Sequence, residues 1–442
     1  MPLHAKPLGN KVHAIDAALP RAGAMPGLRR DPLTWLARAR RRHGDAFAIA
    51  DGAPLLSRER NCAGTVAVFG AELHRAVLTD VDRYVLPISI AQVLDLPPPL
   101  ANLGAGLRDA LHDRRRLAAV RVPVGAVDAI VAARCARWRR RSAVRLVEAM
   151  HALTIDLAAR VLFGDAAFSP TVLVDYAQML RAAAAGERDD ADARAALVRR
   201  GLAADAALRA WRREARGDGV LVPPAHDDAL PDDAFAALAY GAFVACCEPV
   251  EIALTWLVVL LSQQAGLRAA LRTAEPGDGT RHGLVARVVD ETLRLLPPYA
   301  LLARVTATPV VLAGRSLPAG CEVVVSPFLA QRDPQVFPEP RRFVPDRWLA
   351  PRPSPFDHFP FGAGGHACAG RALALALVDA ALAALVRCAD VVLAGDQAID
   401  WRARRRLRPV HDPVVRFRAS RRAGEGGAIY GGLLRLVDFA KP

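Results

Sequence analysis

Helical patterns of apolar residues run through most of the chain. Between residues 125 and 215 apolar side chains recur with helical spacing in an alanine-rich sequence, with a break from Gly164 to Pro170. The longest helical pattern covers residues 232–262 and is apolar on nearly all sides, as expected of a helix buried through the middle of a large fold. Residues 370–389 form another such pattern, rich in alanine and leucine. These patterns predict a mainly α protein.

Shorter elements are predicted on both sides of this helical region. Asp31 is a suitable N-cap for a helix that has Pro32 in its first position. Short apolar runs bounded by glycine and proline predict strands, and those near the N-terminus are expected to form a small β-rich lobe. In chain order we predict a helix ending near Arg42, strands over 46–50 and 64–69, helices over 71–79 and 284–296, a hairpin formed by 310–312, 314–320 and 322–325, and short strands from 387 to 418.

One large domain is predicted over residues 26–418, because no internal repeat and no shift in composition divides the chain. Residues 1–25 are a polar, proline-containing extension without the apolar core of a signal peptide. The glycine-rich residues 419–442 are expected to be a loosely attached tail. The most apolar run, residues 252–261, is too short to cross a bilayer. We therefore expect a monomeric, soluble and cytoplasmic protein with no membrane span.

Arginine dominates the charge of the protein. The 442 residues carry a formal net charge of +14, and Lys6, Lys11 and Lys441 are the only lysines. An acidic partner and nucleic acid are two functional explanations, and nucleotide-composition bias in the source genome is a third. The arginine-rich stretches 38–42 and 134–141 contain a single aromatic residue between them, so we expect no nucleic-acid partner.

The cysteines predict no disulfide framework. They number seven, are scattered along the sequence, and show no C-x-x-C spacing that indicates zinc or a redox pair. Cys368 has a distinctive setting in the glycine-rich segment 359–371, just before a helical pattern. The glycines allow close approach of a flat ligand, and free N–H groups at a helix start favour a thiolate. For Cys368 taken alone, a buried structural cysteine beside a helix cap is the simpler interpretation.

The spacing around the cysteine adds information. Phe361, Gly364, Cys368 and Gly370 match the pattern F-x-x-G-x-x-x-C-x-G, and His366 lies two residues before the cysteine. This segment resembles the haem-binding signature of the cytochrome P450 family in its bacterial form. The resemblance implies a cytochrome P450 fold, a large helical bundle with a small β-rich lobe. It also implies haem b (iron protoporphyrin IX), with Cys368 as the axial iron ligand and Phe361 packed against the proximal face.

Basic residues elsewhere resemble the groups with which the family holds the haem propionates. His112 and Arg116 are four residues apart, share a helix face, and resemble the family's H-x-x-x-R pair. A solvated basic face is the simpler alternative for this pair. Arg304 lies where the family has a further propionate-binding arginine, and the resemblance implies that His366 serves the same edge. The apolar loop 87–111 corresponds to the family's cover over the substrate pocket.

Glu291 and Arg294 share one face of a predicted helix and resemble the family's E-x-x-R motif. Arg347, in the segment F-V-P-D-R-W, matches the third member of that cluster. The resemblance implies a buried Glu–Arg–Arg cluster in which every charge is hydrogen-bonded. We assign these residues to folding and haem retention rather than to chemistry.

The helix over residues 232–262 resembles the family's oxygen-side helix, A-G-x-E-T-T-x-x-x-L-T-W. Ala245 and Glu248 match this pattern, whereas Cys246 replaces the glycine and Pro249 replaces the usual threonine. In the family the acid and the alcohol relay protons to bound dioxygen. Proline has no hydroxyl and no N–H for the carbonyl of Ala245, so we expect the helix to kink or open there. A water at the freed carbonyl and Glu248 are the expected proton carriers.

Pro249 leaves three interpretations open. A substrate hydroxyl or an ordered water replaces the threonine in an ordinary hydroxylation. Alternatively, the enzyme uses peroxide or performs coupling, dehydration or rearrangement, none of which needs the relay. In the third interpretation the site is poorly active. The simplest alternative to all three is a neutral kink, with Glu248 in a surface salt bridge.

The resemblance implies a monooxygenase that oxidises a lipophilic small molecule, as in bacterial specialised (secondary) metabolism, with electrons from a separate ferredoxin-type donor. Residues 299–302 are expected to shape an apolar pocket that suits fatty-acyl, terpenoid or polyketide ligands. A catalytically retired haem-binding or small-molecule-binding module is the alternative from another class. A cysteine-nucleophile hydrolase is a third, which predicts purification without haem.

Overall fold

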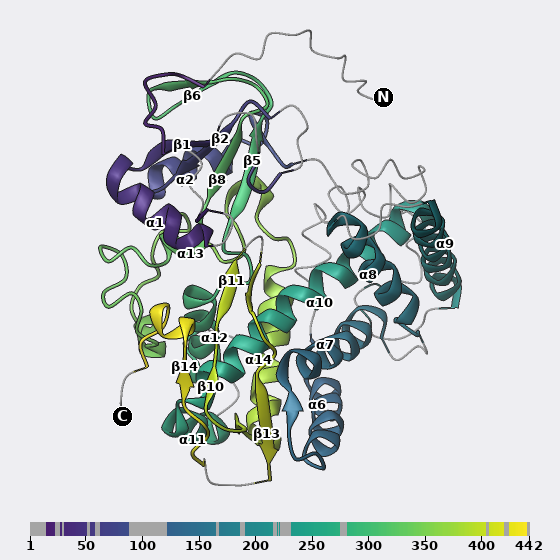
Figure 1. Ribbon diagram of the computed structural model, residues 1–442. Coiled ribbons are helices and arrows are strands. Elements are labelled where there is room, and N and C mark those ends of the chain that lie inside the picture. The colour runs from purple at the N-terminus through teal and green to yellow at the C-terminus, as the bar shows by residue number, and fades with distance from the viewer. Residues whose placement is uncertain are drawn as a thin grey trace.

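The structure is a computed structural model (Figure 1). It describes residues 15–22, 27–28, 31–50, 54–57, 62–87, 122–164, 168–185, 191–214, 219, 221, 231–274, 281–403, 406–419 and 424–439. His112 and Arg116 lie outside these ranges, and so does the predicted pocket cover at 87–111 beyond residue 87.

Helices make up most of the described chain, as the apolar patterns predict. Asp31 caps the first of them, since its side chain accepts a hydrogen bond from the N–H of Thr34. The helices are α1 (Pro32–His43), α2 (Ala71–Thr79), α6 (Val124–Trp138), α7 (Leu146–Phe163), α8 (Thr171–Ala185), α9 (Ala191–Glu214), α10 (Asp232–Ser262), α11 (Ala265–Thr273), α12 (Leu284–Leu295), α13 (Pro327–Ala330) and α14 (Arg371–Cys388), with 3-10 turns η1 (Pro345–Leu349), η2 (Gly364–His366) and η3 (Gly432–Arg435).

Helix α10 passes through the helical part and packs against α7, α12 and α14 (Figure 1). Trp256 and Leu257 on this helix are fully buried. The indole Nε1–H of Trp256 donates to the carbonyl oxygen of Leu407 at 2.9 Å, which ties the helix to a C-terminal hairpin. The helix continues without interruption through Pro249, so the expected opening at this proline is absent.

One segment of α10 is longer and apolar over more residues than the run on which the prediction of no membrane span was based. Among the described residues, Phe235–Ser262 is the only helical segment long and apolar enough to cross a bilayer. It extends well beyond the run 252–261 expected from the sequence. In the structure 78% of its apolar window is buried inside the protein, as is also found for core helices.

The strands form one larger sheet and several small ones. Their bounds are β1 (Ala46–Ala50), β2 (Thr65–Val68), β3 (Tyr84–Val85), β4 (Val144–Arg145), β5 (Leu302–Thr306), β6 (Val310–Leu312), β7 (Arg315–Leu317), β8 (Glu322–Val325), β9 (Asp390–Leu393), β10 (Gln397–Ala398), β11 (Trp401–Ala403), β12 (Leu407–Pro409), β13 (Val414–Arg418) and β14 (Ile429–Tyr430). The larger sheet has the order β1-β2-β8-β5-β3 and builds the small lobe at the top of Figure 1.

The centre of this sheet is fixed by a buried carboxylate. Strands β2 and β8 run parallel, with Val66 opposite Val323. Glu322, at the start of β8, has no exposed surface. Its carboxylate accepts hydrogen bonds from the N–H of Leu56 and from the hydroxyl of Thr65, both at 3.0 Å. Glu322 therefore joins β8 to β2 and to the loop before it.

The predicted three-segment hairpin is wrong in one respect. Strands β6 and β7 do pair antiparallel around Ala313 and Gly314, which have left-handed φ angles of 52° and 70°. Strand β8, however, lies between β2 and β5 in the larger sheet. All its residues are buried, and a strand buried on both faces belongs at the centre of a sheet rather than in an exposed hairpin.

Segments near both ends of the chain pack onto the domain. Ile15 and Leu19 are buried in the core of the small lobe. At the other end β14 pairs with β10, and Leu433 and Val437 have no exposed surface. The prediction of a loosely attached tail is therefore wrong for residues 424–439, because their apolar side chains complete the core.

Candidate functional site

The glycine-rich loop before α14 fixes the position of Cys368. Gly362 and Gly364 have left-handed φ angles of 70° and 69°, a conformation that glycine adopts without strain. The N–H of Cys368 donates to the carbonyl oxygen of Phe361 at 2.8 Å and closes the loop. A Cβ on Gly364 would lie 1.9 Å from the carbonyl oxygen of Leu78, so the loop presses directly on the end of α2.

Cys368 is exposed at the end of this loop. Loss of hydration raises the pKa of this thiol, while the N–H of Gly370 and the guanidinium of Arg371 act in the opposite direction. The pKa of the thiol is therefore raised, whereas the start of the helix alone predicts a lowered pKa. Loss of hydration outweighs the effect of the helix N-terminus. Coordination to a metal ion deprotonates such a thiol outright.

Cys246 on α10 interacts electrostatically with this cysteine. Ala245 is exposed and Cys246 is partly exposed. Burial raises the pKa of Cys246 to about 12, and the charge of Cys368 adds to the shift. The two sulfur atoms are therefore near enough to interact electrostatically, and two segments predicted separately meet at one site.

Glu248 is on the same helix and is held by two guanidinium groups. It is 6% exposed. Its carboxylate oxygens accept hydrogen bonds from Arg406 and from Arg408, each at 2.5 Å. This is a buried double ion pair rather than the surface salt bridge considered from the sequence. Pro249, the next residue, is half-buried within the unbroken helix.

Arg304 on β5 is a buried cation. It is 4% exposed, and its Nη1 donates to the carbonyl oxygen of Ala303 at 2.9 Å. Its Nε has no hydrogen-bond partner among the residues that the structure describes. Burial lowers the pKa of Arg304 to about 10, because a charged group loses hydration there. A carboxylate supplied by a ligand would satisfy this guanidinium.

The other predicted site residues on the loop share one short segment with the cysteine. His366 is half-buried in η2, and Phe361 is partly buried with the guanidinium of Arg371 5.9 Å from its ring centre. A Cβ on Gly370 would lie 3.9 Å from the sulfur of Cys368. The loop thus brings five of the predicted positions together, listed in chain order as Phe361, Gly364, His366, Cys368 and Gly370.

The predicted Glu–Arg–Arg cluster is formed. The carboxylate of Glu291 accepts hydrogen bonds from Arg294 and Arg347, each at 2.9 Å. The N–H of Val344 at 2.9 Å and the indole N–H of Trp348 at 3.1 Å complete its shell. These last two donors were not predicted from the sequence, although both belong to the F-V-P-D-R-W segment that contains Arg347.

Four charged residues near the site were missed from the sequence. Arg406 and Arg408 belong to the C-terminal hairpin, and Glu251 and His151 extend their network. Alternation of arginine with apolar residues around β12 indicated a strand but not the partner of its arginines. Only the fold brings this strand beside α10.

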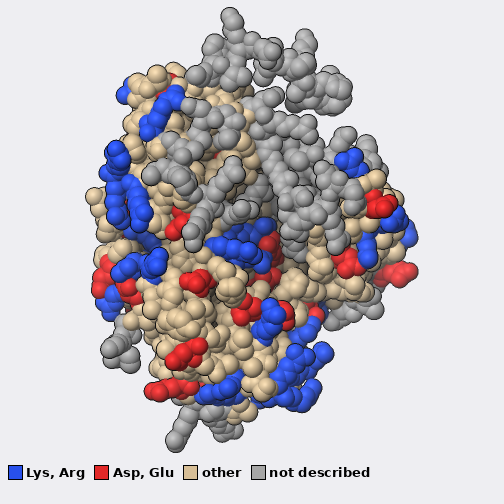
Figure 2. All heavy atoms as spheres, viewed as in Figure 1, with Lys and Arg blue, Asp and Glu red and all other residues tan. Residues whose placement is uncertain are grey.

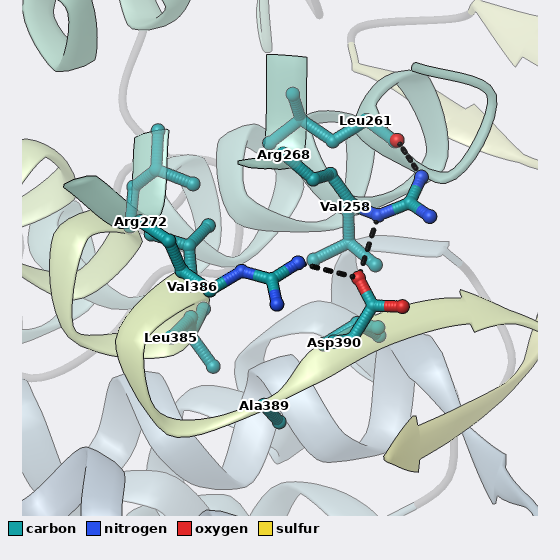
Figure 3. Close-up of a pocket in the computed structure, with 10 residues that line it drawn as sticks. Val258, Leu261, Arg268, Arg272, Leu385, Val386, Ala389 and Asp390 are labelled. Atoms are coloured by element: carbon teal, nitrogen blue, oxygen red, sulfur yellow. Dashed lines mark hydrogen bonds and ion pairs between the residues drawn. The ribbon is translucent and has the colours of Figure 1, made fainter. Parts of the chain in front are cut away.

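A separate cavity lies between the C-terminal parts of α10 and α14 (Figure 3). Its lining is apolar apart from Arg268, Arg272 and Asp390, and both arginines bind the aspartate. Its volume of about 20 Å³ has room for about one water molecule. Cys368 does not line it, and a substrate-sized ligand does not fit.

The donor set around Cys368 fits the haem implied by the sequence. An accessible thiol supplies one axial ligand, and the buried guanidinium of Arg304 suits a carboxylate at the edge of the cofactor. Because Gly364 has no side chain, the loop can lie directly against the end of α2. Within the described ranges no group of three or more His, Cys, Asp or Glu residues is placed to hold a bare metal ion.

Sequence comparisons agree with this geometry. Residues 226–400 match the sequence model of the family described as Cytochrome P450. The chain is 37% identical over 151 residues to cyclooctatin synthase of Streptomyces melanosporofaciens, which covers 31% of this chain and 33% of that protein. It is 43% identical over 102 residues to cyclooctat-9-en-7-ol 5-monooxygenase of the same species, 22% of each chain. The matched part thus spans about a third or less of these relatives.

Comparison with solved structures covers nearly the whole chain. The structure titled retinoic acid bound cyanobacterial CYP120A1 superposes with a TM-score of 0.71 at 18% identity, over 91% of this chain and 99% of that one. At this identity the likeness establishes the fold. The predicted mainly α bundle with a small β-rich lobe is confirmed.

Proposed function

Because the chain belongs to the cytochrome P450 family, we propose that it is a haem-thiolate monooxygenase that oxidises a lipophilic small molecule. The observation that carries this proposal is the exposed Cys368, held on a tight glycine loop within electrostatic range of Cys246 on α10. A thiol in this position has the surroundings needed for an axial iron ligand. The proposed domain for this activity is residues 26–418.

Haem b supplies the oxygen-activating chemistry when it is bound. In the proposal Cys368 would hold the haem iron through its thiolate, Phe361 would pack against the porphyrin, and Gly364 and Gly370 would keep the loop close. Arg304 and His366, together with His112 and Arg116, neutralise the propionates. The support within the described chain is the unpaired Nε of buried Arg304.

The proposed substrate is apolar and terpene-like. A sequence relative of this chain is named for cyclooctat-9-en-7-ol, and both relatives described above come from a Streptomyces species. The segment 299–302, predicted to shape the pocket, includes the fully buried Ala300 and the nearly fully buried Leu301. We place the protein in bacterial specialised metabolism on these grounds.

A second candidate function follows from the pair Glu248 and Pro249. Proline supplies no hydroxyl, and both carboxylate oxygens of Glu248 are engaged by arginines. This arrangement favours peroxide-driven oxidation, or coupling, dehydration or rearrangement, over dioxygen activation through the usual relay.

For the dioxygen route we propose a cytoplasmic, monomeric protein that receives electrons from an acidic ferredoxin-type donor. Exposed arginines gather at the C-terminal end of α6, at the lower right of Figure 2. They are Arg137, Arg139, Arg140 and Arg141. Complementary charge of this kind accelerates the association of redox partners.

Carbon monoxide difference spectra of the purified, reduced protein test the haem-thiolate assignment. We expect a thiolate-haem band for the natural protein and its loss in Cys368→Ala. Cys388→Ala, at the other end of α14, is the matched control and should keep the band. A protein that purifies without haem, even when expressed with ample haem precursor, would overturn the assignment and favour the hydrolase.

Turnover assays then separate the enzyme hypotheses. Product formation with reduced ferredoxin and dioxygen supports the monooxygenase, and product formation with peroxide alone supports the second candidate. Haem loading without turnover by any donor, across a panel of terpenes and fatty acids that shift the haem absorption, supports a binding module.

A further inference from the structure

Two carboxylates flank Pro249 on α10 and are joined by one arginine. Glu248 precedes the proline and Glu251 follows it, and both are buried, at 6% and 4% exposure. Arg408 donates a hydrogen bond from Nη2 to Glu248 at 2.5 Å, and its Nη1 forms an ion pair with Glu251 at 3.1 Å. A planar guanidinium with several donors is suited to bridge two acceptors in this way.

Two further side chains extend the network to other elements. Arg406 donates to the second oxygen of Glu248 at 2.5 Å. His151, on α7, lies with its Nδ1 2.8 Å from the second oxygen of Glu251 and is 33% exposed. The network therefore connects α7, α10 and the hairpin of β11 and β12. It balances two buried negative charges with two positive ones, which buried ion pairs require.

The proline at the centre of this network weakens its own helix. It has no N–H to donate to the carbonyl of Ala245, and its ring clashes with that carbonyl. Even so, α10 is continuous from Asp232 to Ser262. Contacts from outside the helix backbone are therefore needed to keep this turn helical.

The hairpin that carries the arginines is itself fixed. The N–H of Leu407 donates to the carbonyl oxygen of Pro298 at 3.0 Å, and the carbonyl of Leu407 accepts from Trp256 at 2.9 Å. Arg408 therefore projects from a strand that is anchored independently of Glu248 and Glu251. An anchored strand provides the support that the turn at Pro249 lacks.

We propose that Arg408 is a positioning residue that braces the proline-containing turn of α10 by holding Glu248 and Glu251 against the hairpin. The braced turn follows directly after Cys246, which interacts electrostatically with Cys368, so the brace supports the part of α10 next to the candidate site. A guanidinium stays protonated at any working pH, so the network fixes charges and does not conduct protons from His151 to Glu248.

Hydrogen–deuterium exchange on the haem-loaded, full-length protein tests the brace. We expect Arg408→Gln to speed exchange about tenfold in peptides that span residues 242–252, because opening of the unsupported turn exposes its amides. Arg402→Gln is the matched control: it is an exposed arginine of the same hairpin and should leave these peptides unchanged. Glu251→Gln removes only the ion pair between Arg408 and Glu251, so it should give a smaller acceleration of exchange. This variant replaces Arg408→Gln in the test if Arg408→Gln does not fold.

A double-mutant cycle distinguishes bracing of the proline from a general loss of stability. Pro249→Ala restores the missing N–H donor, so Arg408→Gln in that background should accelerate exchange less than about threefold. Equal acceleration in both backgrounds would overturn the proposal, and so would unchanged exchange in Arg408→Gln alone. Amide exchange is measured without substrate or turnover. Haem loading is measured separately by the carbon monoxide spectrum, so a failure of the proposed function is distinguished from a failure of the brace.

Discussion

Helices α12 and α10 each bury a glutamate that two arginines neutralise, but the two clusters differ in their exposure to water. At Glu291 the partner Arg294 lies on the same helix and its side chain is 0% exposed, while that of Arg347 is 13% exposed. The N–H groups of Val344 and Trp348 also donate to this carboxylate. Every contact lies inside the protein, so this cluster belongs to the folding core.

The Glu248 cluster is more open. Arg406 and Arg408 have side chains 30% and 25% exposed, and Arg408 lies 160 residues further along the chain than Glu248. Movement of one hairpin would release this carboxylate, whereas release of Glu291 requires disruption of the core. A glutamate neutralised by two arginines therefore serves global stability at Glu291 and local geometry at Glu248.

Removal of a core arginine should have the largest effect. Arg294→Met leaves the Glu291 carboxylate buried with one arginine fewer, and loss of one member of a buried ion-pair set costs about 3–5 kcal/mol. We expect the free energy of unfolding in urea to fall by that amount, together with the yield of haem-loaded protein.

Arg342→Met is the control for this change. Arg342 pairs with Glu339 at the surface, with side chains 42% and 60% exposed, so its loss should change the unfolding free energy by less than about 0.5 kcal/mol. Similar losses for Arg294→Met and Arg342→Met would contradict the assignment of Glu291 to the core.

Asp379 is a third carboxylate, and the arginine that pairs with it is shared with a second carboxylate. Asp379 on α14 pairs with Arg281, which also binds Asp290 at 2.7 Å. Burial raises the pKa of Asp379 from 3.8 to about 6, although Arg281 acts to lower it. The folded protein then binds the proton more tightly than the unfolded chain does. This contribution to stability is fully present below pH 3.8 and is lost as the pH rises through about 6.

The expected size of the contribution from Asp379 is about 2–3 kcal/mol. Urea unfolding measured between pH 4 and 7 should therefore show a fall that is absent in Asp379→Asn. Asp128→Asn is the control, because Asp128 is a surface acid with a side chain 44% exposed. An unchanged pH profile in Asp379→Asn would refute the role given to this carboxylate.

Much of the fold follows from local sequence. Asp31 and Pro32 set the start of α1, Pro297 follows the end of α12, and α10 is apolar over a length that no strand matches. The position of β8 is set by pairing with β2, more than 250 residues away, and the hairpin prediction was wrong for that reason. The packing of residues 424–439 likewise depends on partners that lie outside their own segment.

The candidate site divides in the same way. Cys368, Gly364 and the pair Glu291–Arg294 fall within short segments, so their resemblance to the motifs of a known family identifies them. The arginine partners of Glu248 belong to no motif, because an ion pair across 160 residues leaves no periodic signal in one sequence. The pKa of Cys368 was expected in the wrong direction, since desolvation depends on the surrounding protein rather than on the helix that follows.

The smallest change expected is at Glu248. Glu248→Gln removes the charge but keeps a hydrogen-bonding side chain, and water can reach Arg406 and Arg408 because both are partly exposed. We expect a loss of about 1.5 kcal/mol in the free energy of unfolding, and an unchanged carbon monoxide band. Urea unfolding beside Arg294→Met makes the comparison direct. A loss as large as that of Arg294→Met would mean that the open cluster bears on global stability as much as the closed one, and the distinction between core and site wall would fail.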